Sequence, residues 1–101
     1  MIIIYSTFSN KEEAENIAKI LLQKRLIACV NYFPIKSFYW WQGKIEESKE
    51  IGMFIKTLKI NFSKVKKLIK KHHSYATPCI ISWKIDKADK KYFNWLKREL
   101  N

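Results

Sequence analysis

Apolar residues recur near the start of the chain with the period of an amphipathic helix. Positions i, i+3, i+4, i+7 and i+8 of one helical face are occupied by Ala14, Ile17, Ala18, Leu21 and Leu22. The preceding Ser9-Asn10-Lys11-Glu12 fits a capping box, with Ser9 as the cap and Glu12 reaching back to it. The pattern predicts a helix over residues 10–26, and the β-rich, apolar residues 2–8 before it predict a first strand.

Two later segments repeat the helical period, and a strand lies between them. One stripe is formed by Phe62, Val65, Leu68, Ile69 and His72, and lysines fill nearly all the remaining surface of that segment. Pro78 interrupts the chain, and residues 79–85 then have the composition of a strand. Asp86 to Asp89 open a last predicted helix, which carries Tyr92, Phe93, Leu96 and Leu100.

The middle of the chain has the alternation of strands. Residues 28–33 predict a strand that Pro34 ends, because proline cannot donate a ladder hydrogen bond. A third strand is predicted through residues 38–42 and a fourth over 51–58, with a turn at Gln42-Gly43-Lys44. Residues 1–101 therefore form one domain with the order β-α-β-β-β-α-β-α. We expect an α+β sandwich of the ferredoxin-like, split βαβ type, with a long aromatic hairpin.

Four consecutive aromatic residues occupy that hairpin. Successive side chains of a strand point to opposite faces, so Phe38 and Trp40 line one face while Tyr39 and Trp41 line the other. A chain of 101 residues has too few helices to cover both faces of its sheet. A partner subunit is the expected cover, and these four residues are the expected interface.

The chain is strongly basic, with 20 Lys and Arg residues against 9 Asp and Glu and a net charge of +11. All the basic residues except Arg25 and Arg98 are lysine. Base readout and bidentate phosphate contacts favour arginine, so we interpret the lysines as solvated surface. A basic nucleic-acid-binding module of the same fold is the alternative, to be recognised by steep salt dependence of nucleic-acid binding.

The N-terminus lacks the features of a signal peptide, and no apolar run is long enough to span a bilayer. We expect a cytoplasmic protein without a membrane partner. Cys29 and Cys79 lie far apart in sequence without CxxC spacing, so the favoured interpretation is two buried, unpaired thiols.

Several classes of activity lack their motifs. Gly43 and Gly52 are the only glycines, which excludes phosphate-binding loops. There is no GxSxG elbow and no RNP1-like strand. We therefore expect no catalysis and no required cofactor. A small enzyme would need His73 or Lys56 with a perturbed pKa beside a substrate pocket.

One polar segment, His72-His73-Ser74-Tyr75-Ala76-Thr77-Pro78-Cys79, joins the second predicted helix to the last strand. Imidazole and thiolate bind copper and zinc, so His73 and Cys79 are candidate metal ligands. The alternative is a histidine at a helix C-terminus that hydrogen-bonds the last carbonyls. Glu46, Glu47 and Glu50 either supply oxygen ligands or solvate the hairpin, and we favour solvation.

Five segments together resemble the CutA family of divalent-cation tolerance proteins, and the resemblance covers essentially the whole chain. The matching segments are Leu26-Ile27-Ala28-Cys29-Val30-Asn31, Phe38-Tyr39-Trp40-Trp41-Gln42-Gly43-Lys44-Ile45-Glu46-Glu47, Ile55-Lys56-Thr57, His73-Ser74-Tyr75-Ala76-Thr77-Pro78 and Tyr92-Phe93-Asn94-Trp95-Leu96. The resemblance implies a tight, PII-like homotrimer that responds to copper and other metal ions. It places Lys56, His73, Tyr75 and Trp41 in an inter-subunit cleft that takes a metal ion or a small ligand.

The chain departs from the family pattern at its potential ligands. Ser74, Ala76 and Cys79 replace a proline and two acids in the turn after the second helix, and Ser6 stands where some members have cysteine. A full metal-ligand set is therefore not carried over. We expect any bound ion to be copper or zinc, because Cys79 adds a soft sulfur where a hard carboxylate is lost.

Overall fold

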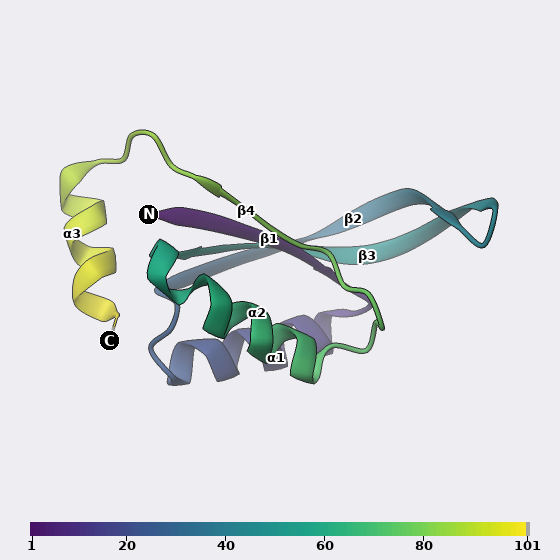
Figure 1. Cartoon of the computed structure of the whole chain (residues 1–101), viewed down its shortest axis with the longest axis horizontal. Helices are drawn as coiled ribbons and strands as arrows, with labels where there is room; N and C mark the ends of the chain where they lie inside the picture. The colour runs from purple at the N-terminus through teal and green to yellow at the C-terminus, as the bar shows by residue number, and fades with distance from the viewer. Residues whose placement is uncertain (101) are drawn as a thin grey trace.

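The computed structural model describes residues 1–100, which form a four-stranded antiparallel sheet with three α-helices (Figure 1). The elements are β1 (Ile2–Phe8), α1 (Lys11–Gln23), β2 (Cys29–Trp41), β3 (Lys44–Thr57), the 3₁₀ turn η1 (Lys59–Asn61), α2 (Phe62–His72), β4 (Ile80–Lys84) and α3 (Lys90–Glu99). Helices α1 and α2 cover one face of the sheet, and α3 lies at the end opposite the hairpin (Figure 1). This arrangement confirms the predicted α+β fold class.

The strand order is β2-β3-β1-β4, and every neighbouring pair is antiparallel. β1 and β3 are therefore central, while β2 and β4 are edge strands. The two crossings through α1 and α2 give the split βαβ connectivity that the sequence predicted.

The prediction of separate strands before and after Pro34 was wrong. β2 runs unbroken from Cys29 to Trp41, with Pro34 opposite Ile51 of β3. An edge strand tolerates proline because the missing donor can lie on the side that has no partner. Because the two predicted strands are one, the sheet has one strand fewer than the sequence suggested. β3 also begins earlier than predicted, at Lys44.

The predicted turn between the two long strands is confirmed. Gln42 and Gly43 have φ values of 49° and 77°, as a two-residue type I′ hairpin requires. Trp41 and Lys44 are partners in the register on either side of the turn.

Helix α1 begins one residue later than the predicted capping box. Asn10, and not Ser9, is the N-cap, and its side-chain oxygen accepts a hydrogen bond from the Glu13 amide at 2.8 Å. α3 similarly begins at Lys90, after Asp89 accepts a hydrogen bond from the Tyr92 amide at 3.1 Å.

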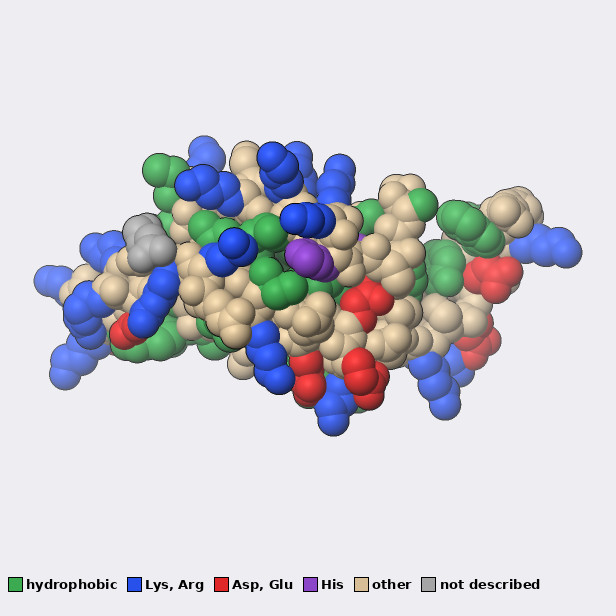
Figure 2. Space-filling model, turned by 90° about the horizontal axis from the view of Figure 1, so that it is seen from below, with side chains coloured by type: hydrophobic (Ala, Val, Ile, Leu, Met, Phe, Trp, Pro, Cys, Tyr) green, Lys and Arg blue, Asp and Glu red, His purple; other side chains and the backbone are tan. Residues whose placement is uncertain are grey.

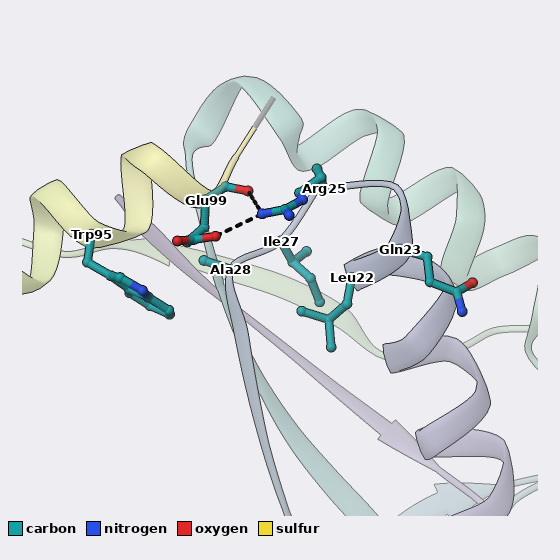
Figure 3. A pocket seen from close by; sticks show the side chains of 7 residues that line it. All are labelled: Leu22, Gln23, Arg25, Ile27, Ala28, Trp95 and Glu99. Atoms are coloured by element: carbon teal, nitrogen blue, oxygen red, sulfur yellow. Dashed lines mark hydrogen bonds and ion pairs between the residues drawn. The ribbon is translucent and has the colours of Figure 1, made fainter.

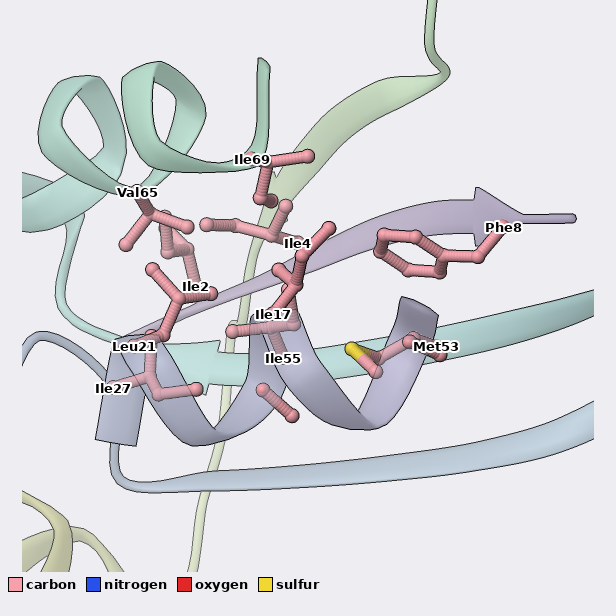
Figure 4. Close-up of a cluster of buried hydrophobic side chains, with 12 residues drawn as sticks. Ile2, Ile4, Phe8, Ile17, Leu21, Ile27, Met53, Ile55, Val65 and Ile69 are labelled. Atoms are coloured by element: carbon pink, nitrogen blue, oxygen red, sulfur yellow. The ribbon is translucent and has the colours of Figure 1, made fainter. Parts of the chain in front are cut away.

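The hydrophobic core lies between the sheet and the two helices (Figure 4). Alternate residues of β1 point into it, so Ile2, Ile4 and Phe8 are buried. They pack with Ala14, Ile17, Ala18, Leu21, Ile27, Met53, Ile55, Val65 and Ile69. The stripe predicted on α1 enters the core except for Leu22, which is exposed.

The sheet surface turned away from α1 and α2 carries aromatic side chains. The Phe54 ring lies 5.5 Å from Tyr5, 5.2 Å from Phe33 and 6.1 Å from Trp83, measured between ring centroids. We call these four residues the aromatic face. Trp83 is exposed at its edge.

Residues 36–49 of β2 and β3 project from the body as a two-stranded hairpin arm (Figure 1). The molecule is elongated as a result, with extents of 45 × 26 × 21 Å. The large apolar side chains of the arm are all exposed, and they are Phe38, Tyr39, Trp40, Trp41 and Ile45.

Candidate functional site

His73 lies directly after α2, and its side chain is fully buried. Its Nε2 donates a hydrogen bond to the Thr7 carbonyl at 2.8 Å, and its Nδ1 accepts one from the Tyr75 amide at 3.0 Å. The ring stacks on Phe8 at a centroid distance of 4.9 Å. Nε2 therefore holds the α2–β4 loop to the end of β1, while Nδ1 accepts a hydrogen bond within the loop. The alternative of a histidine bonded to the last carbonyls of its own helix is wrong.

Glu13 of α1 completes the anchoring of this loop. One of its carboxylate oxygens accepts a hydrogen bond from the Ser74 amide at 3.1 Å and lies 3.3 Å from His73 Nδ1. The loop is thus attached to β1 through His73 and to α1 through Glu13. A metal ion could reach His73 only by displacing these contacts.

Tyr75 and Glu50 form a second buried contact. The Tyr75 hydroxyl donates to Glu50 Oε2 at 2.6 Å, and Glu50 is only 9% exposed. Burial, and next the hydrogen bond to Glu50, raise the pKa of Tyr75 well above its usual range. The favoured solvating role was therefore wrong for Glu50, although Glu46 and Glu47 are exposed as expected.

Cys79 lies close enough to Glu50 for the two groups to interact electrostatically. Burial, and next the charge of Glu50, raise the pKa of the Cys79 thiol. The pKa of Tyr5 is also raised, first by burial and then by Cys79 and Glu50. We call Tyr5, Glu50, Tyr75 and Cys79 the Glu50 cluster. Its sulfur and carboxylate are two candidate donors to a metal ion, and the thiol must lose its proton to bind one.

Ser6 fixes the backbone beside this cluster. Its hydroxyl donates to the Cys79 carbonyl at 2.6 Å, from a fully buried position on β1. Both cysteines are free thiols within residues 1–100, but each is only half-buried, so the prediction that they are buried was wrong.

No group of three or more metal-ligating side chains converges within the described chain. His73 is occupied by backbone partners, while Cys79 and Glu50 supply at most two donors. Metal binding at His73 and Cys79 therefore stays a prediction, and one chain alone presents an incomplete ligand set.

Lys56 and Trp41 lie at opposite ends of the sheet. Lys56 faces Cys29 in the β2–β3 register, and its Nζ lies 5.7 Å from the centre of the Tyr92 ring. Trp41 faces Lys44 at the tip of the arm, and Lys44 lies 12 residues before Lys56 along β3. At a rise of about 3.3 Å per residue, roughly 40 Å separates them. A cleft that contains both residues must therefore be built by two chains.

Two open hollows lie elsewhere on the surface. One, of about 360 Å³, lies between α1 and α3, where Arg25 Nη1 and Glu99 Oε2 form an ion pair at 2.8 Å beside Trp95 (Figure 3). The other, of about 410 Å³, lies between the N-terminus of α1 and the base of the arm, with Glu50 in its wall. None of the residues predicted for the inter-subunit cleft lines either hollow.

Sequence reasoning missed the role of Glu50. The available signal was its position in β3, because strand alternation places Glu50 on the same side as Gly52 and Phe54. An acid on the apolar side of a strand requires a buried partner, and Tyr75 provides it.

No helix in residues 1–100 is long and apolar enough to cross a membrane.

The model of the CutA1 divalent ion tolerance protein family matches residues 2–99. The divalent-cation tolerance protein CutA of Archaeoglobus fulgidus is 50% identical over 93 residues, covering 92% of this chain and 91% of that protein. Its Pyrococcus horikoshii counterpart is 46% identical over 99 residues, covering 98% and 97%.

A solved structure extends the similarity to three dimensions. The periplasmic divalent cation tolerance protein CutA of Archaeoglobus fulgidus matches with a TM-score of 0.97 and 47% identity, covering 100% of both chains. Sequence and structure thus agree along the whole length of the domain. The chain belongs to the CutA1 family of divalent ion tolerance proteins.

Proposed function

We propose that the protein contributes to divalent-cation tolerance as a PII-like homotrimer. In this assembly the hairpin arm and the aromatic face of each chain are covered by neighbouring copies. The observation that carries the proposal is the exposure of the arm, where Trp40 is 73% and Ile45 66% accessible in the single chain. Apolar surface of this kind marks an interface when it is contiguous.

Two different apolar surfaces on one chain favour a head-to-tail contact between copies. Such a contact closes into a ring when the rotation between neighbours allows it. A ring of three is the assembly that the family resemblance implies. It would bring Trp41 of one chain towards Lys56, His73 or Tyr75 of another. Within a single chain, Trp41 lies too far from Lys56 for the two to share a cleft.

In this proposal the cleft between chains takes a copper or zinc ion or a small ligand, without catalysing a reaction. Cys79 and Glu50 are the chain's best placed donors, and further donors come from a neighbouring copy. Both nitrogens of His73 already have partners, so no histidine base is available at the Glu50 cluster. We therefore assign His73 the role of positioning the loop. It becomes a metal ligand only if metal binding rearranges the loop.

A metal titration tests this part of the proposal. Cu(I) and Zn(II) are titrated into the wild type and into Cys79→Ser, with Cys29→Ser as the matched control because it removes the other half-buried thiol. We expect Cys79→Ser to weaken Cu(I) binding at least about tenfold and Cys29→Ser to leave it unchanged. Undiminished binding by a Cys79→Ser, His73→Ala double variant would place the site elsewhere.

The pH dependence of binding gives a second readout. Because the pKa of Cys79 is raised, the proton competes with the metal throughout the neutral range. Affinity should rise by up to about tenfold per pH unit as pH increases below that pKa, since one proton leaves for each ion bound. A flat profile between about pH 6 and pH 8, a range that lies below the usual thiol pKa, would exclude Cys79 as a ligand.

We propose the cytoplasm as the compartment, supported by two half-buried cysteines that remain unpaired. The Archaeoglobus fulgidus relative is described as periplasmic. Fractionation of the source cells distinguishes the two compartments, and recovery in the periplasmic fraction would overturn this assignment.

A further inference from the structure

Helix α2 carries a surface of one charge sign. Its five lysines are Lys64, Lys66, Lys67, Lys70 and Lys71, and the helix contains no acidic residue. Acidic residues are absent from the whole of residues 51–85, although α1 and the hairpin arm mix both signs. A general lysine bias of the surface does not explain this segregation. Figure 2 shows a group of Lys and Arg side chains along the upper edge of the helical side, where no acidic side chain is visible, while other Lys and Arg side chains lie at the ends and along the lower edge.

No close ion pair within residues 1–100 joins these lysines to a counter-charge. Lys64, Lys67, Lys70 and Lys71 are exposed. The close ion pairs within the described chain involve Arg25, Lys36 and His73, and none involves an α2 lysine. Like charges at i, i+3 and i, i+4 repel one another along a helix, so α2 keeps an unfavourable arrangement that a polyanion would relieve.

The apolar side of α2 is already used. Val65 and Ile69 are fully buried in the core, and Phe62 is half-buried with Lys66 Nζ 5.8 Å from its ring centre. A helix that lies in a membrane interface must insert its apolar side, and α2 cannot. Ile60, just before the helix, is exposed, but a single isoleucine is a small anchor.

We propose that the lysine side of α2 docks on the phosphate backbone of double-stranded nucleic acid without reading its sequence. Lysine supplies point charges suited to phosphate, while the bidentate base contacts made by arginine are missing from α2. The helix has 11 residues and is about 16 Å long, a length of B-DNA that carries about ten phosphate charges. This surface belongs to the single chain, so the proposal does not rest on the trimer or on metal binding.

The segregation of charge thus changes the interpretation drawn from composition. Lysines interleaved with acids, as on α1, are adequately explained by solvation. A basic surface without acids concentrates positive potential and attracts polyanions at low salt.

The test compares two variants of equal charge. Lys64→Gln, Lys67→Gln and Lys71→Gln remove three exposed lysines from α2, and the control removes Lys87, Lys90 and Lys91, which are exposed around the start of α3. Each triple variant lowers the net charge of +11 by three. Binding of a labelled, mixed-sequence DNA duplex is measured by fluorescence anisotropy between about 50 and 200 mM salt, with circular dichroism to verify folding.

We expect the wild type to bind with an affinity that falls steeply with salt. The α2 variant should weaken binding about tenfold or more and reduce the salt slope by about 2 to 3, since each lost phosphate contact removes about 0.9. The control should change the slope by less than about 1. Equal weakening by both variants would show a net-charge effect and overturn the proposal. Binding to vesicles of anionic phospholipid without binding to the duplex would also overturn it, in favour of a membrane surface.

Discussion

The two halves of β3 lie in contrasting surroundings. From residue 51 onward, Met53, Ile55 and Thr57 are buried beneath the helices, so the chain covers this side of the strand by itself. Towards the arm, Ile45 is 66% exposed although it is as apolar as Ile55. Hydrophobicity alone therefore does not determine burial in this chain. The helical side of the body covers its own apolar surface, whereas we propose that the arm and the aromatic face are covered by neighbouring copies.

The largest expected effect follows from placing a charge on the arm. Trp40→Asp should abolish assembly or soluble folding, because an aspartate cannot be buried unpaired in an apolar interface. Ile60→Asp is the control, since Ile60 is 83% exposed but lies outside the arm. Gel filtration with light scattering measures the effect. Equal behaviour of the two variants would remove the distinction between arm and body.

The next prediction compares the two halves of β3 directly. Ile55→Ala should lower the free energy of unfolding by about 2–5 kcal/mol at any protein concentration, because it leaves a cavity in the core. Ile45→Ala should instead weaken assembly, so that its cost appears as a stronger dependence of the melting temperature on concentration. Urea unfolding and thermal melting at several concentrations separate the two. A core-like, concentration-independent loss for Ile45→Ala would contradict the account.

Tyr75→Phe should lower the free energy of unfolding by about 1–3 kcal/mol, because Glu50 loses a buried hydrogen-bond donor. The folded-state pKa of Tyr75 is raised, so its contribution to stability is complete below pH of about 10, the unfolded value, and is lost as pH rises further. The variant should therefore lose less stability than the wild type in alkali. Tyr92→Phe, which removes a hydroxyl outside the Glu50 cluster, is the control, and an identical alkaline decline for all three proteins would count against the contact.

The smallest effect concerns the start of α1. Asn10→Ala should cost about 1 kcal/mol of unfolding free energy, because the Glu13 amide loses its cap. Ser9→Ala should cost little, since its hydroxyl reaches Glu13 only at 3.4 Å. If urea unfolding showed a larger loss of unfolding free energy for Ser9→Ala than for Asn10→Ala, Ser9 would be the cap, as the capping box predicted.

Local patterns predicted much of the body. The stripe on α1 follows the helical period and the β1 burial follows the strand period, so both elements could be placed from sequence. The continuity of β2 could not, because the cost of Pro34 depends on whether the strand lies at an edge, and that is set by the order of the sheet.

The candidate site was less predictable, because its contacts join distant parts of the chain. His73 meets Thr7 and Tyr75 meets Glu50, pairs separated by 66 and 25 residues. The motif around His73 located the loop correctly. It gave no sign that both ring nitrogens would be used by the backbone or that Glu50 would be buried beneath Tyr75.

The central claim is that copies of the chain cover the arm that the body leaves bare. Light scattering on the wild-type protein, over a wide range of concentration, tests it most directly. We predict a mass of about 37 kDa, three times that of the 12.2 kDa chain, together with a melting temperature that rises with concentration wherever the assembly dissociates. A stable, folded monomer of 12.2 kDa with its arm exposed to water would contradict the account.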